Sequence, residues 1–347
     1  MNNRKNNFEI MRLIAAMMVI ISHIGPVSGR SFDLGTLGFL GVIIFFSISG
    51  YLVTLSWDRD PHLGRFLMRR SLRIFPALVV CVAICALVVG SILTVDPLSS
   101  YFTSPFFWSF CRSVFLFPVQ SSLPGVFVHS PMPFVVNGPL WTLPMEFTMY
   151  LALAGLAQIG AWQPRYVLFI LVILTCLDIC LSSVWTLPQA PLFLTMNVIQ
   201  LLSSAVAFCT GAALARAPRK DFLLWWAFIP IAGLYVWRCN DPSAVFLILA
   251  GVPYATLAIA TRSTPVLRMT GRFGDPSYGV YIYAFPIQQC VYYFWPKLSL
   301  PVYVVICMTA PVIVGFMSWH LVEKIALRWA PKKTPVWTPE DKVGSIG

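Results

Sequence analysis

The chain has 347 residues, of which 58% are hydrophobic and 11% are charged, and its formal net charge is +11. The charged fraction is less than half that of an ordinary soluble domain, and apolar runs long enough to cross a bilayer recur along the sequence. This composition excludes an ordinary soluble protein and predicts an all-α polytopic membrane bundle. The basic residues separate apolar runs instead of forming one patch, so nucleic acid is not expected as a partner.

The first apolar run, residues 8–27, contains Arg12 near one end and His23 near the other. It is long and no small-residue cleavage site follows it, so it is predicted to be a membrane span and not a signal peptide. Eleven helical positions bring Arg12 and His23 onto one face, about 16 Å apart along the axis. Such residues usually face a protein interior or a water-filled pathway. The alternative is that Arg12 reaches the interface and His23 simply packs.

The sequence predicts about ten membrane spans in one domain, residues 1–330, followed by a short basic cytoplasmic tail, residues 331–347, expected to be disordered. The predicted spans cover roughly 8–27, 37–57, 74–95, 140–160, 166–184, 192–214, 222–237, 244–261, 277–295 and 301–323. With both termini in the cytoplasm, the basic residues left outside are Arg30, Arg112, Arg238 and Lys297. Because positive charge concentrates on cytoplasmic segments, this asymmetry supports the orientation.

The second predicted span carries the small residues Ser47, Ser49 and Gly50, which permit close approach of a neighbouring helix. Ser49 could instead be a nucleophile, but a lone serine shows no sign of activation, so packing is the preferred interpretation. Between the third and fourth spans, residues 96–139 mix aromatic residues with prolines. They predict either a loop or a short interfacial helix between Trp108 and Phe117.

Arg69, Arg70 and Arg73 lie where the inner loop leads into the third predicted span. Arg70 and Arg73 are three residues apart and therefore share a helix face. Guanidinium groups bind phosphate with paired hydrogen bonds, so the cluster could anchor a polyanionic cytosolic ligand. Ordinary positive-inside anchors look the same, and from spacing alone that interpretation is favoured.

Glu146, in the fourth predicted span, is the carboxylate that the sequence places best for chemistry. Counted from the outer ends of their spans, His23 and Glu146 lie roughly 7 Å and 9 Å deep, in one layer. A carboxylate beside an imidazole fixes its tautomer and stabilises the imidazolium form. A hydrogen-bonded strut between helices is the alternative. Asp178 either joins this cluster or caps a helix end, and the cap is the preferred interpretation. Glu323 is interpreted as an interfacial ion-pair partner of a basic residue.

The nine cysteines include no CxxC pair, so neither a metal site nor a disulfide framework is expected. No internal repeat of the kind that transporters show is apparent.

Several motifs, taken in order, resemble one known family, and the resemblance extends from Glu9 to Lys324. They are E-x-x-R followed by His (Glu9, Arg12, His23), FFSISGYL (45–52), RRSLRIFPA (69–77), NGPLWTLPMEFTMY (137–150), PSYGVYIYAFPI (276–287) and WHLVEK (319–324). In this order and spacing the chain is similar to the membrane-bound acyltransferase-3 family, bacterial proteins that O-acylate carbohydrates. The Arg-to-His spacing combined with W-T-L-x-x-E is the specific part.

The resemblance implies a ten-span bundle of the bacterial inner membrane that uses cytosolic acyl-CoA, commonly acetyl-CoA, and binds no permanent cofactor. It implies a carbohydrate acceptor such as O-antigen, exopolysaccharide or lipo-oligosaccharide at the periplasmic side. The resemblance implies three groups of functional residues. The catalytic residues are Arg12, His23 and Glu146. The donor-binding residues are Arg69, Arg70 and Arg73, and the substrate-binding residues are Trp141, Ser277, Tyr278 and Tyr281. Many members have His where this chain has Ala284, so the acceptor pocket is expected to differ. Many also carry a fused outer SGNH-type domain, and this chain resembles the stand-alone members.

The mechanism expected from these residues has His23 as general base on the acceptor hydroxyl, oriented by Glu146. Arg12, about three turns from His23, would guide the phosphate end of the donor, with Arg70 and Arg73 at the mouth of a channel. The alternative function is a proton-coupled transporter or flippase of a glycan or lipid-linked substrate, in which Arg, His and Glu form a relay.

Overall fold

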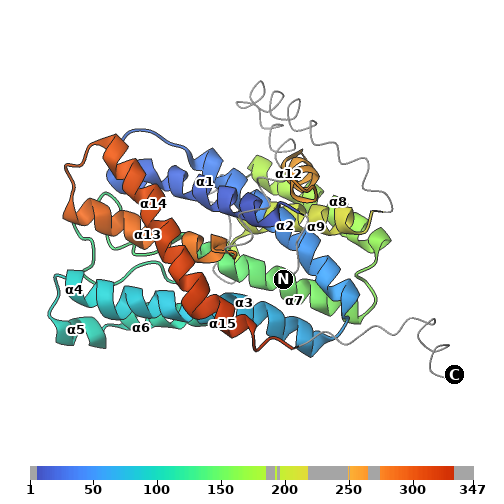
Figure 1. The fold of residues 1–347 in the computed structure, drawn as a ribbon, viewed down its shortest axis with the longest axis horizontal. Helices are drawn as coiled ribbons and strands as arrows, with labels where there is room; N and C mark the ends of the chain where they lie inside the picture. The colour runs from blue at the N-terminus through green and yellow to red at the C-terminus, as the bar shows by residue number, and fades with distance from the viewer. Residues whose placement is uncertain are drawn as a thin grey trace.

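The computed structural model describes residues 6–184, 192–193, 196–217, 249, 251–264 and 274–331. In this part of the chain the protein is an all-helical bundle, apart from a hairpin that pairs β1 (Leu192–Phe193) with β2 (Met196–Asn197). Figure 1 shows most of the long helices running side by side along the longest axis of the molecule. The predicted all-α class is confirmed.

The helices are long where the sequence is apolar and short around the proline-rich segment. In chain order they are α1 (Phe8–Ser28), α2 (Gly35–Arg59), α3 (Leu63–Ala83), α4 (Ser91–Leu93), α5 (Leu98–Thr103), α6 (Pro105–Arg112), α7 (Thr142–Gln158), α8 (Pro164–Val184), α9 (Val198–Ala215), α12 (Val252–Ala260), α13 (Ser277–Phe294), α14 (Leu300–Ser318) and α15 (Lys324–Leu327). Two π-helical segments, Ile84–Gly90 and Trp319–Glu323, join α3 to α4 and α14 to α15. A 3₁₀ turn, Gly138–Trp141, leads into α7.

Among the described residues, 7 helical segments are long and apolar enough to cross a membrane. They are Phe8–Ser28, Gly35–Arg59, Leu63–Leu93, Gly138–Gln158, Pro164–Ser182, Val198–Ala215 and Leu300–Leu327. The predicted spans at 222–237 and in the first part of 244–261, and the tail from residue 332, lie outside the described residues. The chain is thus a multi-pass membrane protein, whereas the count of ten and the orientation stay predictions.

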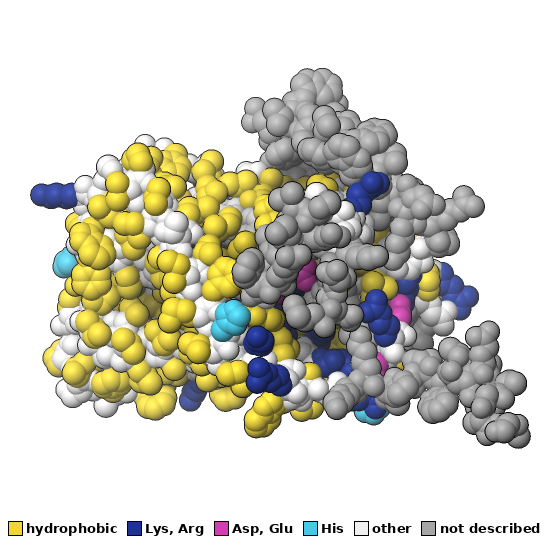
Figure 2. Space-filling view, in the orientation of Figure 1, with side chains coloured by type: hydrophobic (Ala, Val, Ile, Leu, Met, Phe, Trp, Pro, Cys, Tyr) yellow, Lys and Arg dark blue, Asp and Glu magenta, His cyan; other side chains and the backbone are white. Residues whose placement is uncertain are grey.

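Charged side chains gather toward one end of the bundle. Figure 2 shows an almost continuous hydrophobic surface over the other part of the visible face, with Lys, Arg, Asp and Glu mainly toward the end where α2 stops and α3 begins. The third helix starts earlier than predicted, at Leu63 instead of residue 74. Arg65 and Arg69 therefore lie on this helix and not in a loop, and Asp60 accepts hydrogen bonds from both guanidinium groups.

The centre of the bundle is held together by glycine contacts between α1, α2 and α9. A β-carbon added at Gly41 would lie 2.6 Å from the Ala15 carbonyl oxygen, and one at Gly38 would lie 2.3 Å from the Ser22 hydroxyl oxygen. These contacts set an antiparallel register between α1 and α2. On the other side of α2, an added β-carbon at Gly50 would lie 1.9 Å from the Phe208 carbonyl oxygen. The predicted close approach at this stretch of α2 is confirmed.

Replacing Gly50 with valine is expected to prevent normal packing of α2 on α9. Overpacking a core costs about 1–3 kcal/mol when side chains can adjust. Here the obstacle is backbone, so we expect the free energy of unfolding to fall by an amount at the top of this range or above. Gly155→Ala is the matched control, because nothing lies within 4 Å of its added β-carbon. Melting temperatures of the two variants in detergent check this, and a Gly50→Val protein as stable as Gly155→Ala contradicts it.

The proline-rich segment forms short helices instead of a span. The α6 helix buries Phe107 and Phe110 and leaves Phe106 and Trp108 exposed. A short helix is thus present in this segment, and it begins earlier than predicted, at Pro105, where Ser104 caps it. Its position at the membrane interface stays a prediction.

The cap predicted for Asp178 is wrong. This buried carboxylate accepts hydrogen bonds from the Ser203 hydroxyl and so links α8 to α9.

Candidate active site

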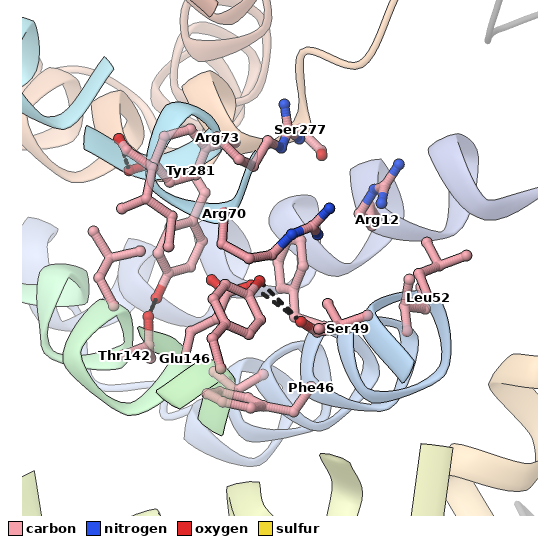
Figure 3. Close-up of a pocket in the computed structure, with 18 residues that line it drawn as sticks. Arg12, Phe46, Ser49, Leu52, Arg70, Arg73, Thr142, Glu146, Ser277 and Tyr281 are labelled. Carbon is pink, nitrogen blue, oxygen red and sulfur yellow. Dashed lines mark hydrogen bonds between the residues drawn. The ribbon is translucent and has the colours of Figure 1, made fainter. Parts of the chain in front are cut away.

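A pocket lies among α1, α2, α3, α7 and the start of α13. Its polar lining comes from all five helices and comprises Arg12, Ser49, Arg70, Arg73, Thr142, Glu146, Tyr150, Ser277, Tyr278 and Tyr281. Figure 3 shows the Arg12, Arg70 and Arg73 guanidinium groups toward one end, the Thr142–Tyr281 hydrogen bond at the other, and Glu146 and Ser49 between them. The pocket therefore has a cationic end and a central polar group.

Two of the arginines are tied to a buried carboxylate. Asp275, just before α13, accepts from Arg12 at 2.9 Å and from Arg73 at 2.7 Å through the same oxygen, Oδ2. Arg73 also pairs with Glu323 at 3.0 Å, so the ion pair predicted for Glu323 is confirmed. Burial alone would raise the pKa of Asp275, but the positive charges of Arg12 and Arg73 lower it to about 2. The carboxylate is therefore ionised at neutral pH.

Arg70 differs from its two neighbours. None of the described residues forms an ion pair or hydrogen bond with its guanidinium group, and its Nε is buried without a hydrogen-bond partner. The guanidinium carbon lies 5.8 Å from the ring centroid of Tyr150, a cation–π contact. A half-buried cation that lines a pocket and is not paired with any described carboxylate is suited to an anionic ligand.

Glu146 joins α7 to α2 through hydroxyl groups. Its Oε1 accepts from the Tyr150 hydroxyl in a short hydrogen bond and from Ser49 Oγ at 3.2 Å. Ser49 Oγ and the Tyr150 oxygen are themselves 3.0 Å apart. The strut that the sequence left open as an alternative is thus present, and it lines the pocket.

His23 lies beyond the pocket and does not contact Glu146, so the predicted contact between them is wrong. Its Nδ1 lies 2.7 Å from the Val19 carbonyl oxygen, and its ring meets the Phe285 ring edge-on at 5.3 Å. Because a carbonyl can only accept, Nδ1 carries the proton in the neutral ring, which leaves Nε2 as a proton acceptor. The imidazole is therefore oriented as a base by the backbone of its own helix and not by Glu146.

The register of the helices explains the error. Gly38 faces Ser22, beside His23, whereas Ser49 is about 16 Å farther along α2. Similarly, Phe285 contacts His23 and would lie 3.4 Å from a β-carbon added at Gly138, and Glu146 on α7 follows Gly138 by about two turns. Counting depth from helix ends assumes that the helices start level, and these do not.

The other predicted residues separate into those in the pocket and those outside it. Ser277, Tyr278 and Tyr281 line it, but each hydroxyl already donates within the protein, to Asp275, Ile74 and Pro139 respectively. Trp141 lies in the 3₁₀ turn and is not part of the lining. Ala284 is buried on α13.

Arg69 is also outside the pocket, so its predicted place beside Arg70 and Arg73 is wrong. It pairs with Asp60 at 2.7 Å. Hydrogen bonds from Arg65 and Arg69 hold the pKa of Asp60 well below its usual range, despite burial of the carboxyl group. Arg69 faces away because it is one helical position from Arg70, which is a rotation of about 100°.

Two residues of the site were not identified from the sequence. Asp275 directly precedes the PSYGVY motif, and an acidic residue at the start of a predicted span was the available signal. Tyr150 closes the NGPLWTLPMEFTMY motif, four residues after Glu146, which is the spacing of neighbours on a helix face.

Comparison with known proteins identifies the family. The acyltransferase-3 family model, described as an acyltransferase domain, matches residues 5–320. An O-acetyl transferase of Shigella phage Sf6 is 32% identical over 95% of this chain and 98% of its own length. Nodulation protein 10 of Rhizobium leguminosarum bv. viciae is 29% identical, over 94% of each chain.

The peptidoglycan O-acetyltransferase OatA of Listeria monocytogenes serovar 1/2a is 27% identical over 80% of this chain and 48% of its own length. No solved structure matches the chain. These relatives support an enzyme over the transporter considered as an alternative. With the membrane-spanning helices and a family match over nearly its whole length, this chain belongs to the acyltransferase-3 family and is a membrane O-acyltransferase.

Proposed function

We propose that this protein transfers an acyl group, in the first instance acetyl, from cytosolic acyl-CoA to a hydroxyl of a cell-surface carbohydrate at the periplasmic side of a bacterial inner membrane. The observation that carries the proposal is the cationic end of the pocket, where Arg70 has no carboxylate partner among the described residues. The O-acetyltransferase names of two relatives support the acetyl group and a hydroxyl acceptor.

The donor would enter with its phosphate groups at the cationic end. Arg70 offers a guanidinium that is not ion-paired with any described carboxylate, and Arg12 and Arg73, which share Asp275, lie at the same end. The thin pantetheine arm would then run along the pocket toward Tyr281. His23 lies about one turn beyond this end, because its partner Phe285 follows Tyr281 by four positions on α13.

In this arrangement His23 Nε2 would take the proton of the acceptor hydroxyl as its oxygen attacks the thioester carbonyl. The C–S bond then breaks and the CoA thiolate leaves, taking up a proton. The Val19 carbonyl keeps the ring in the required tautomer throughout. Arg12 acts on the donor's phosphate end in this scheme, since it is about three turns from His23.

The function is tested by supplying radiolabelled acetyl-CoA to membranes from a host that carries the native glycan. Label that appears on polysaccharide only when the protein is present, and that mild base removes, is the expected result. Glycan that stays unlabelled in the presence of folded wild-type protein would overturn the proposal. Mass spectrometry of the labelled glycan then identifies the sugar and the position acylated.

Replacing Arg70 with alanine is expected to raise the KM for acetyl-CoA by about 10- to 100-fold, since hydrogen bonds to charged groups contribute about 1.5–3 kcal/mol. Arg65→Ala is the matched control, because Arg65 is on the same helix and pairs with Asp60 outside the pocket. Steady-state kinetics with acetyl-CoA as the varied substrate check this. Equal KM values for the two variants would remove Arg70 from the donor site.

A further inference from the structure

The central polar group of the pocket, Glu146, Ser49 and Tyr150, has no role in the scheme above. It stands between the cationic end and the end nearest His23, in the path that the donor would take (Figure 3). Ser49 marks the position of this group along α2. It lies about 12 Å beyond Gly41, which faces Ala15 on α1. A ligand that joins the two ends of the pocket must therefore pass this group.

The group has unused hydrogen-bonding capacity. Glu146 Oε1 accepts from Tyr150 and Ser49, whereas none of the described residues donates to Oε2. Glu146 itself is half-buried and lines the pocket. The Ser49 and Tyr150 oxygens can each accept a further hydrogen bond. The free oxygen of this carboxylate can accept a hydrogen bond from a neutral N–H donor.

Apolar side chains also line the pocket. Phe45, Val42 and Leu143 line it, and Phe45 meets Tyr281 edge-on. An apolar wall with one convergent polar group selects a ligand that is mostly hydrocarbon and carries a few fixed polar atoms. A nucleotide or a sugar would leave many polar atoms without partners here.

We propose that Glu146, Ser49 and Tyr150 recognise the amide groups of a pantetheine arm, with Glu146 Oε2 accepting from an amide N–H. This inference rests on the proposed function, in which the donor is a thioester. A pantetheine arm carries its two secondary amides between a phosphate and the thioester sulfur. The pocket has the same order: guanidinium groups lie at one end, a hydrogen-bonding group lies in the middle, and the His23 imidazole lies beyond the other end. Acyl-CoA and acylated carrier protein share this arm.

The test compares two inert competitors of acetyl-CoA, desulfopantetheine and an analogue in which ester oxygens replace both amide N–H groups. For the wild-type protein we expect the inhibition constant of the ester analogue to be at least about 10-fold higher than that of desulfopantetheine, because the ester leaves the carboxylate without a donor. For Glu146→Gln the two constants should agree within about threefold. Ser47→Ala is the matched control, since Ser47 is on the same helix and donates to its own backbone at Ile43; it should retain the wild-type ratio.

Three outcomes overturn the inference while leaving acyl transfer from a thioester intact. These are an equal preference for the amide in wild-type and Glu146→Gln proteins, no preference in either, and an acyl group found on Ser49 by mass spectrometry, which would make Ser49 a nucleophile. Failure of the proposed function is distinct, because wild-type membranes would then transfer nothing from any thioester. Comparing acetyl-CoA with acetylated carrier protein identifies the source of the arm.

Discussion

Replacing His23 with alanine is expected to lower the rate of acyl transfer by about 10²- to 10⁴-fold, the usual contribution of a positioned general base. The ring is half-buried and its Nδ1 is held by the Val19 carbonyl, so Nε2 is the nitrogen available to the acceptor. The KM for acetyl-CoA should change little, because the donor's phosphate end binds about three turns away. Initial rates on membranes with labelled acetyl-CoA provide the measurement.

Ser22→Ala is the control for this variant. The Ser22 hydroxyl donates to the same Val19 carbonyl at 2.8 Å and lies 3.3 Å from His23 Nδ1, but it is buried against α2 and not presented to a substrate. We expect Ser22→Ala to keep most of its activity. A His23→Ala protein that transfers at a near-normal rate would remove His23 from the mechanism and leave Glu146 as the remaining candidate base.

Replacing Asp275 with alanine is expected to destabilise the protein by about 3–5 kcal/mol, the cost of leaving a buried charge without its partner. Arg12 would lose the carboxylate that it contacts at 2.9 Å, and Arg73 would keep its contact with Glu323. Because the bridge connects α1 and α3 to the start of α13, the cationic end of the pocket should also lose its shape. Thermal unfolding in detergent, followed with acetyl-CoA binding, measures both effects.

Asp58→Ala is the matched control, since Asp58 pairs with Arg216 at a more exposed position, where an ion pair contributes about 0–1 kcal/mol. The contribution of the Asp275 carboxylate should be present at neutral pH and should disappear as the pH falls toward 2. A carboxyl whose pKa is lowered to about 2 contributes stability that is complete above its ordinary value and is lost only as the pH falls toward 2. A difference between wild-type and Asp275→Ala proteins that is undiminished at pH 2 would contradict this account of the bridge.

Features that depend on composition and on spacing along one helix were predicted best. Apolar runs predicted the membrane helices, and the small residues around Gly50 predicted close packing on a neighbouring helix. The spacing of Arg70 and Arg73 placed both on one face, and both line the pocket. These are properties of a single segment, which the period of the α-helix fixes without reference to the rest of the molecule.

Contacts between helices were predicted less well. The sequence placed His23 beside Glu146 and left Asp275 without a role, whereas the structure joins Asp275 to Arg12 and Arg73, and Glu146 to Ser49 and Tyr150. The sequence by itself determined the class of protein, its family and the helices that carry the polar side chains. Only the tertiary structure decided which of these side chains meet. The offset of one helix against another depends on where glycine and small side chains allow two backbones to approach, as at Gly38 and Gly41, and no count along one helix contains that offset.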